Sequence, residues 1–138
     1  MSSIVRFGVS LEKDLLSKFD VYLRKNGWAS RSDALRDLVR GELIKQEWTE
    51  GEEVAGAVTL IYDHHRKDLL GRLTDLQHDY QHLVLSAQHV HLDHDHCLEI
   101  IAVKGNPAEV QKLAETLRTI KGVKHGTLTM STTGKHLA

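Results

Sequence analysis

The residues best suited to chemistry in this sequence are four histidines and the only cysteine, all within QHVHLDHDHCLE, residues 88–99. Imidazole and thiolate groups are the ligands that borderline metals such as Zn, Ni, Cu and Co prefer. One cysteine cannot form an internal disulfide, so Cys97 is expected to be a reduced thiol or a metal thiolate. The stretch therefore predicts a metal site, provided that several of its side chains point the same way.

A hairpin that reverses at His94 would bring several of these side chains to one face of a sheet. Such a reversal places His91 opposite Cys97 and His89 opposite Glu99. Directly opposed residues of an antiparallel pair point to the same side, as do residues two apart on one strand. We therefore expect the two histidines and the cysteine to share one metal. Glu99 is expected either to accept an N–H from His89 or to lie exposed as an ordinary sheet carboxylate.

The remaining histidines of this region are placed differently. His94 and His96 belong to the turn and its flank, where we expect them to be solvated or to form at most a weaker second site. His78 lies on a preceding predicted helix, roughly 180° from its apolar stripe, so it should point towards another chain. The pattern favours a site with three ligands from one chain and His78 from its neighbour, with His82 as the alternative fourth ligand.

Three imidazoles and one thiolate do not select a single metal. Zinc would take this ligand set in a tetrahedron, and Ni(II) or Cu(II) would take it in a plane. Catalysis would need an open coordination position, and four protein ligands fill either kind of shell. The ligand set therefore predicts a sensing or structural site, and we expect the protein not to be an enzyme.

Residues 55–138 are predicted to form the domain that carries this site. Strands are expected over 54–63, 82–92, 97–105 and 123–130, with helices over 65–80 and 107–122. The order βαββαβ is that of the ferredoxin-like fold, in which both helices cover one face of the sheet and the other face needs a partner. His64 and His65 are expected to be ordinary residues at the start of the first helix.

Residues 1–48 are predicted to form a second, smaller unit. Val5, Phe7, Val9 and Leu11 alternate with polar residues and glycine, as in a half-buried strand, and two amphipathic helices follow. So short a unit buries little surface, and its single strand has no partner. The ribbon-helix-helix arrangement solves both problems, because two chains form an obligate dimer whose two-stranded ribbon enters the major groove of DNA. The chain is thus expected to be α+β, with residues 49–54 as the linker.

The charges of the two parts differ in sign. Residues 1–45 carry nine Lys/Arg and six Asp/Glu, a balance of +3, whereas the remaining residues carry nine and thirteen, a balance of −4. The unit predicted to meet DNA is the more basic one. No apolar run reaches the roughly 18–20 residues that a membrane span needs, and the N-terminus lacks the apolar core of a signal peptide. We expect a cytoplasmic protein with no membrane partner.

Over nearly its whole length the sequence resembles the nickel-responsive transcriptional regulators of the NikR family. The resemblance rests on RFGVSLEKDLL, SRSDALRDLVR, LIYDHHRKDL, the QH at 77–78, HVHLDHDHCLEI and GVKHG. It implies a homotetramer whose core is four ferredoxin-like (ACT-type) domains, flanked by two ribbon-helix-helix dimers. It also implies square-planar Ni(II) bound by His89, His91 and Cys97, with His78 from the opposing subunit.

The resemblance further implies contacts with DNA and with another cation. The family's DNA-reading strand positions map to Arg6, Gly8 and Ser10. The middle position commonly carries a hydroxyl or another small polar side chain, so Gly8 is a departure that bears on which bases are read. The family also has a cation site between its two kinds of domain, which maps to Asp33 and Asp37.

A regulatory mechanism follows as a hypothesis. Nickel would order helix 65–80 and shift the population of domain arrangements towards one that binds double-stranded DNA at an inverted-repeat operator. Arg66 and Lys67 lie at the start of that helix, where they can reach phosphate and add affinity without sequence preference. The family implies repression of nickel-uptake genes when Ni(II) is bound. The alternatives are a sensor for Cu, Co or Zn on the same scaffold, and a metal-binding ACT-type regulatory module without a DNA function.

Overall fold

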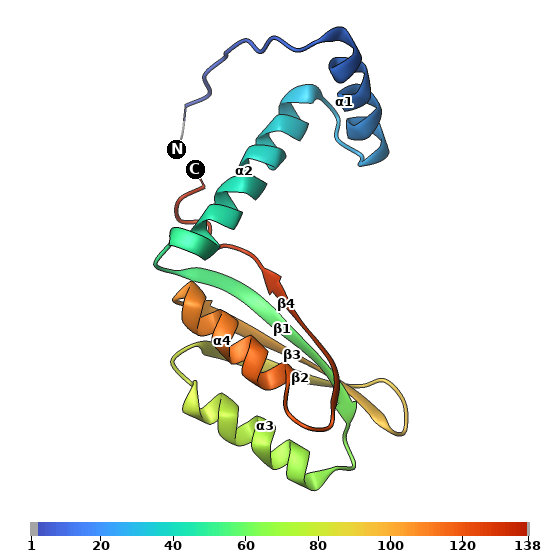
Figure 1. Ribbon diagram of the computed structural model, residues 1–138, viewed down its shortest axis with the longest axis vertical. Helices are drawn as coiled ribbons and strands as arrows, with labels where there is room; N and C mark the ends of the chain where they lie inside the picture. The colour runs from blue at the N-terminus through green and yellow to red at the C-terminus, as the bar shows by residue number, and fades with distance from the viewer. Residues whose placement is uncertain (1–2, 138) are drawn as a thin grey trace. The chain divides into compact units, whose positions relative to one another are not determined.

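The computed structural model of the chain describes residues 3–137, which divide into two compact units (Figure 1). Unit 1 reaches as far as Leu43 and includes the C-terminal residues from His136, and unit 2 is Ile44–Lys135. Helix α2, Arg31–Glu50, begins in unit 1 and ends in unit 2. The residues predicted as the linker, 49–54, therefore comprise the end of this helix, three connecting residues and the first residue of strand β1.

Unit 1 is built from helix α1, Lys13–Lys25, and the first part of α2. Helix α1 ends at Lys25, and two residues later the chain turns at Gly27, whose φ of 79° is readily adopted only by glycine. Helix α2 begins after Ser30, which caps it: the Asp33 N–H donates to Ser30 Oγ at 3.1 Å, and the Ser30 hydroxyl donates to the Asp33 carboxylate at 3.0 Å. Arg31 holds the two helices together through a bidentate pair with Asp20, with both N···O distances at 2.9 Å.

The strand predicted over residues 5–11 is not formed in the single chain. The described residues before α1 belong to no helix or strand. Val5, Phe7, Val9 and Leu11 are all exposed, by 79, 77, 56 and 44% respectively. A lone strand has no partner for its backbone N–H and C=O groups, so it does not form by itself. The ribbon of a ribbon-helix-helix dimer remains a prediction.

Unit 2 is an antiparallel sheet of four strands with two helices. Along the chain come β1 (Val54–Asp63), α3 (Lys67–Asp79), β2 (Val84–His91), β3 (His96–Gly105), α4 (Pro107–Arg118) and β4 (Val123–Met130). The strands lie in the order β2-β3-β1-β4. This is the α+β architecture with βαββαβ order predicted for the second domain, and every predicted strand and helix of that domain is present.

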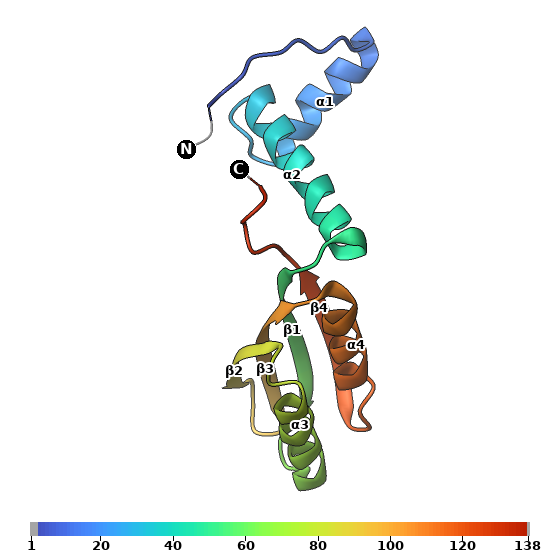
Figure 2. The ribbon, with the colours of Figure 1, turned by 90° about the vertical axis from the view of Figure 1, so that its left-hand side faces the viewer.

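Helices α3 and α4 cover one face of the sheet (Figures 1 and 2). Alternate residues of β3 are buried on that face, and the residues between them are partly exposed. The end of α2 also belongs to this core, because the Trp48 indole N–H donates to the Ser131 carbonyl at 2.8 Å. The buried core residues are Trp48, Val54, Val58, Leu60, Tyr62, Leu69, Leu73, Leu83, Cys97, Ile101, Val103, Val110, Leu113, Ala114 and Leu117. Of the helices that the structure describes, none is long and apolar enough to span a bilayer.

Candidate metal centre

The hairpin of β2 and β3 has the register that the sequence predicts. His91 pairs with Cys97, and His89 pairs with Glu99. All four side chains therefore lie on one side of the sheet. That side is the one covered by the helices, because Cys97 and Glu99 are only 2 and 1% exposed. The two histidines stand on β2 at the edge of the sheet and remain exposed, so this part of the site is open to solvent.

Glu99 is buried, so it is not an exposed sheet carboxylate. The Tyr62 hydroxyl donates to Glu99 Oε1 at 2.6 Å, and the Gln77 side-chain amide donates to Oε2 at 2.5 Å. Burial, and then Glu99, raise the pKa of Tyr62 well above its usual value, so the phenol keeps the proton that it donates. Tyr62 and Gln77 thus fix the carboxylate from β1 and α3, and no local sequence pattern indicates this support.

This carboxylate also orients His89. The Nδ1 atom of His89 lies 3.4 Å from Glu99 Oε1 and 3.2 Å from the Tyr62 hydroxyl oxygen. Because the hydroxyl proton is directed at Glu99, that oxygen faces His89 as an acceptor. Both neighbours favour the tautomer with its proton on Nδ1, which leaves the Nε2 lone pair free for a metal.

Cys97 and His91 have mainly apolar or aromatic neighbours. Cys97 lies opposite Tyr62 of β1, whose side chain it also contacts, and its thiol lies 3.7 Å from the carbonyl of Leu98, a weak contact. The ring of His91 meets the ring of His64 edge to face, with centroids 4.8 Å apart. His64 contributes a buried Nδ1 atom that has no hydrogen-bond partner.

His78 is exposed in the last turn of α3. Its helix packs on the sheet through Leu69 and Leu73, which are buried, and His78 is not part of that stripe. Among the described residues, neither His78 nor the hairpin donors belong to a set of three ligands whose ligand atoms lie within 4.8 Å of one another. One chain thus offers the predicted ligands without gathering all four.

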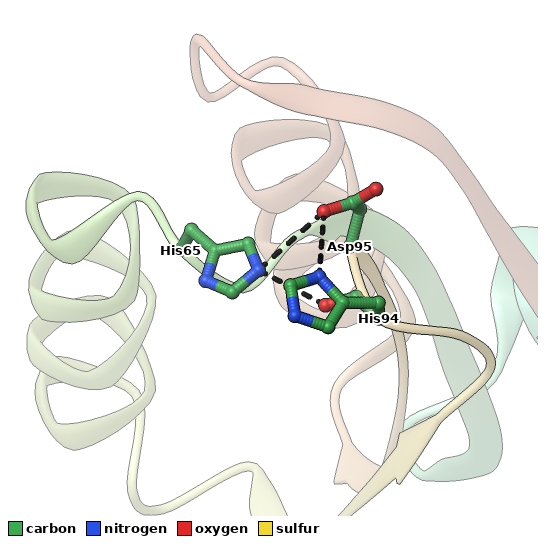
Figure 3. Close-up of side chains that lie close together, drawn as sticks. All are labelled: His65, His94 and Asp95. Atoms are coloured by element: carbon green, nitrogen blue, oxygen red, sulfur yellow. Dashed lines mark hydrogen bonds and ion pairs between the residues drawn. The ribbon is translucent and has the colours of Figure 1, made fainter.

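The ligand set that does come together in one chain is a different one. His65 lies beside His94 and Asp95, between the start of α3 and the β2–β3 turn (Figure 3). We expected His65 to be an ordinary helix-start residue and His94 to be solvated or part of a weaker second site. The pairing of β1 with β3 explains why His65 and His94 meet. Asp63 pairs with His96, so continuing that register past the strand end sets His65 opposite His94.

The residues expected to contact DNA lie in both units. Arg6, Gly8 and Ser10 are exposed in the segment before α1. Arg66 caps the start of α3 and pairs with Asp68 at 3.5 Å, and Lys67 is the first residue of that helix and is exposed.

The two aspartates expected to bind a further cation already have partners. Asp33 bonds to Ser30 and also pairs with Arg36 at 3.0 Å. Asp37 accepts the indole N–H of Trp28 at 2.7 Å. Both carboxylates help to hold unit 1 together, and the expected cation site remains a prediction.

Known proteins resemble this chain over nearly its whole length. Residues 55–131 match the family model of the NikR C-terminal nickel-binding domain. A protein of Syntrophus aciditrophicus assigned as a nickel-responsive regulator is 56% identical over 135 residues, with 98% of each chain covered. One from Solibacter usitatus with the same assignment is 50% identical over 138 residues, with 99% of each covered. An uncharacterised protein of Thermotoga maritima shares the fold, with a TM-score of 0.51 at 15% identity over 56% of this chain and 96% of the other.

Proposed function

The chain belongs to the family of nickel-responsive regulators, which are not enzymes, and from that premise we propose that it is a nickel-dependent, DNA-binding repressor. Nickel is bound by His89, His91 and Cys97 of one chain and by His78 of another. The observation that carries this proposal is the hairpin register, which sets His91 against Cys97 and His89 against a buried Glu99. Three imidazoles and one thiolate suit Ni(II), which they can surround in a plane.

Each protein group has a distinct task at this site. Cys97 supplies the thiolate from the covered side of the sheet, and the two histidines approach from the exposed edge strand. Glu99 keeps the His89 ring in the orientation that presents Nε2. The bound metal would link these donors to His78 of the other chain. Nickel therefore binds tightly only when the two chains are assembled.

The surfaces of both units support an assembly of several chains. In unit 1 the apolar side chains of the first described residues are exposed and suit pairing with a second copy. In unit 2 Leu85 and Met130 are 63 and 49% exposed. We propose a homotetramer in which ribbon-helix-helix dimers flank four sheet domains, located in the cytoplasm.

Nickel acts in this proposal by favouring one arrangement of the domains. His78 lies near one end of α3, and Arg66 and Lys67 lie at the other. Holding that helix presents the two cations to phosphate, and the paired ribbons read an inverted-repeat operator through Arg6 and Ser10. With nickel bound, the protein represses genes of nickel uptake.

The test uses operator DNA selected from random sequence by the nickel-loaded protein. His89→Ala and Cys97→Ala should each abolish nickel-dependent binding, whereas His82→Ala, an exposed histidine that pairs with Glu109, should not. Arg6→Ala should weaken binding to this DNA and leave nickel affinity unchanged, with Arg24→Ala on α1 as the matched control. Nickel-dependent binding by Cys97→Ala would reject the site. If the protein binds nickel tightly but selects no DNA sequence, it is a metal-binding module without a DNA function.

A second measurement identifies the metal. Planar Ni(II) bound to a thiolate absorbs in the near ultraviolet, and Zn(II) in the same site does not. The proposal expects nickel to produce both this absorption and the tightest binding to DNA. Tighter DNA binding with copper, cobalt or zinc would identify the protein as a sensor of that metal on the same scaffold.

A further inference from the structure

Among the described residues, one set of three potential metal ligands is gathered within a single chain: His65, His94 and Asp95. Their ligand atoms all lie within 4.8 Å of one another. His65 Nε2 is 3.5 Å and His94 Nδ1 is 3.2 Å from Asp95 Oδ1. We propose that these residues form a second site for a divalent transition metal such as zinc, nickel, cobalt or copper, which needs no ligand from another chain.

The spacing and the chemistry of this triad both suit such a metal. Bonds of about 2.0–2.2 Å from a metal to nitrogen and oxygen place two donors of one shell about 3.0–3.5 Å apart. Two imidazoles with one carboxylate select borderline metals over Mg(II) and Ca(II), which prefer oxygen alone. The side chains of His65, His94 and Asp95 are 50, 88 and 63% exposed, so water fills the remaining coordination positions.

The backbone around the triad is already held by other groups. The Asp63 carboxylate accepts the His65 N–H at 2.9 Å, and the Asp93 carboxylate accepts the Asp95 N–H at 2.9 Å. The His64 N–H donates to the Asp95 carbonyl at 3.3 Å and joins the two segments. Because the segments are fixed before a metal arrives, binding has to order little more than side chains.

One hydrogen bond within the triad competes with a metal and lowers the metal affinity of the triad relative to that of the nickel site. His65 Nε2 lies 2.9 Å from the carbonyl oxygen of His94, so without metal this nitrogen carries a proton and donates it. To bind a metal through Nε2, the neutral ring must carry its proton on Nδ1 instead. The metal displaces a hydrogen bond, lacks a thiolate ligand and faces solvent, and for these reasons it binds more weakly than at the cysteine-containing site.

The two sites are neighbours that share no ligand. The ring of His64 contacts His91 on one side and His65 on the other, with centroid distances of 4.8 and 4.1 Å. A metal on His65, His94 and Asp95 would fasten the connection between β1 and α3 to the β2–β3 turn. The inference goes beyond the proposed function and does not depend on it, since it uses none of the nickel ligands.

The test is equilibrium dialysis of the full-length protein against Zn(II) in the variant His89→Ala/His91→Ala/Cys97→Ser, which lacks the hairpin ligands. This variant should retain one zinc ion per chain. Adding His65→Ala or Asp95→Asn should weaken that binding at least tenfold, and adding His136→Ala, another exposed histidine, should leave it unchanged. In the NMR spectrum, zinc should move the ring signals of His65 and His94 and leave that of His136 in place. Circular dichroism checks that each variant is folded.

Three results would overturn the second site: no zinc bound by the variant that lacks the hairpin ligands, undiminished binding after His65→Ala and Asp95→Asn, or an equal loss after His136→Ala. The last result would mean that exposed histidines bind zinc without a defined site. The nickel proposal fails by a different result, namely wild-type nickel affinity in the variant that lacks the hairpin ligands. The two failures are therefore distinguishable.

Discussion

Units 1 and 2 differ in how much of their apolar surface the single chain buries. Unit 2 has a continuous core in which Val58, Leu60 and Leu113 are fully buried. In the described part of unit 1, only Leu23 and Ala34 are buried apolar residues, and large apolar side chains such as Val5 and Phe7 are exposed. The difference shows that unit 2 can take its stability from its own chain, whereas in the proposed assembly unit 1 takes most of its stability from a second copy.

The largest expected effect concerns the core of unit 2. Leu113→Ala removes a fully buried side chain of α4 and should lower the free energy of unfolding of unit 2 by about 2–5 kcal/mol. The loss, followed by urea denaturation, should not depend on protein concentration. Lys112→Ala, at the exposed neighbouring position of the same helix, is the control. A small loss at Leu113 would mean that this core is not what stabilises unit 2.

The next effect tests whether unit 1 depends on a second copy. Phe7 is 77% exposed in the single chain, so Phe7→Ala should cost little unless a partner covers the ring. With a partner, we expect a loss of about 1.5–3 kcal/mol that depends on protein concentration, measured by analytical ultracentrifugation of the dissociating dimer. Dissociation identical to that of the wild type would contradict the comparison between the units.

A smaller effect is expected at the buried support of His89. Tyr62→Phe removes the donor to Glu99 and should cost unit 2 about 1–2 kcal/mol. The pKa of Tyr62 is raised in the fold above its ordinary value of 10.0. The protonated hydroxyl therefore contributes its full share to the free energy of unfolding below pH 10, and this contribution declines as the pH rises further. Denaturation between pH 8 and pH 11 should therefore show a steeper loss for the wild type than for Tyr62→Phe. Parallel curves would contradict this assignment.

The smallest effect concerns the β2–β3 turn. Backbone N–H groups of Asp95 and His96 hold the pKa of Asp93 at about 2, below its ordinary 3.8. The stability from this carboxylate is present above pH 3.8 and is lost as the pH falls towards 2. Asp93→Asn keeps an acceptor oxygen but no charge, so its stability should change less across that range, with Asp79→Asn as the control. An equal acid response in wild type and Asp93→Asn would contradict the prediction.

The part of the structure that the sequence predicted well is the part governed by local pattern. Alternation along β2 and β3 and a reversal at His94 were enough to obtain the pairs His91–Cys97 and His89–Glu99. The burial of Glu99 was not predictable in this way, because it depends on Tyr62 from β1 and Gln77 from α3. These residues meet only once the sheet order and the helix position are known.

Two other features needed more than local pattern. His65 and His94 are 29 residues apart and meet because β1 pairs with β3, a pairing that the alternation along each strand does not reveal. The strand over residues 5–11 was predicted from alternation alone, and the single chain does not form it. Alternation reports which side chains can share a face, but a strand also needs another strand beside it.

The central claim is that nickel is held by ligands from two chains, and one mixing experiment tests it directly. His78→Ala retains the three hairpin ligands, and Cys97→Ala retains His78, so neither variant alone should bind nickel tightly. Assembled together and purified through two different tags, each pair of unlike chains contains one complete site out of two. The account predicts that these mixed assemblies bind nickel with near-wild-type affinity, in an amount of up to half that of the wild type, because pairs of like chains hold no complete site. Mixed assemblies that bind no better than the separate variants would contradict it.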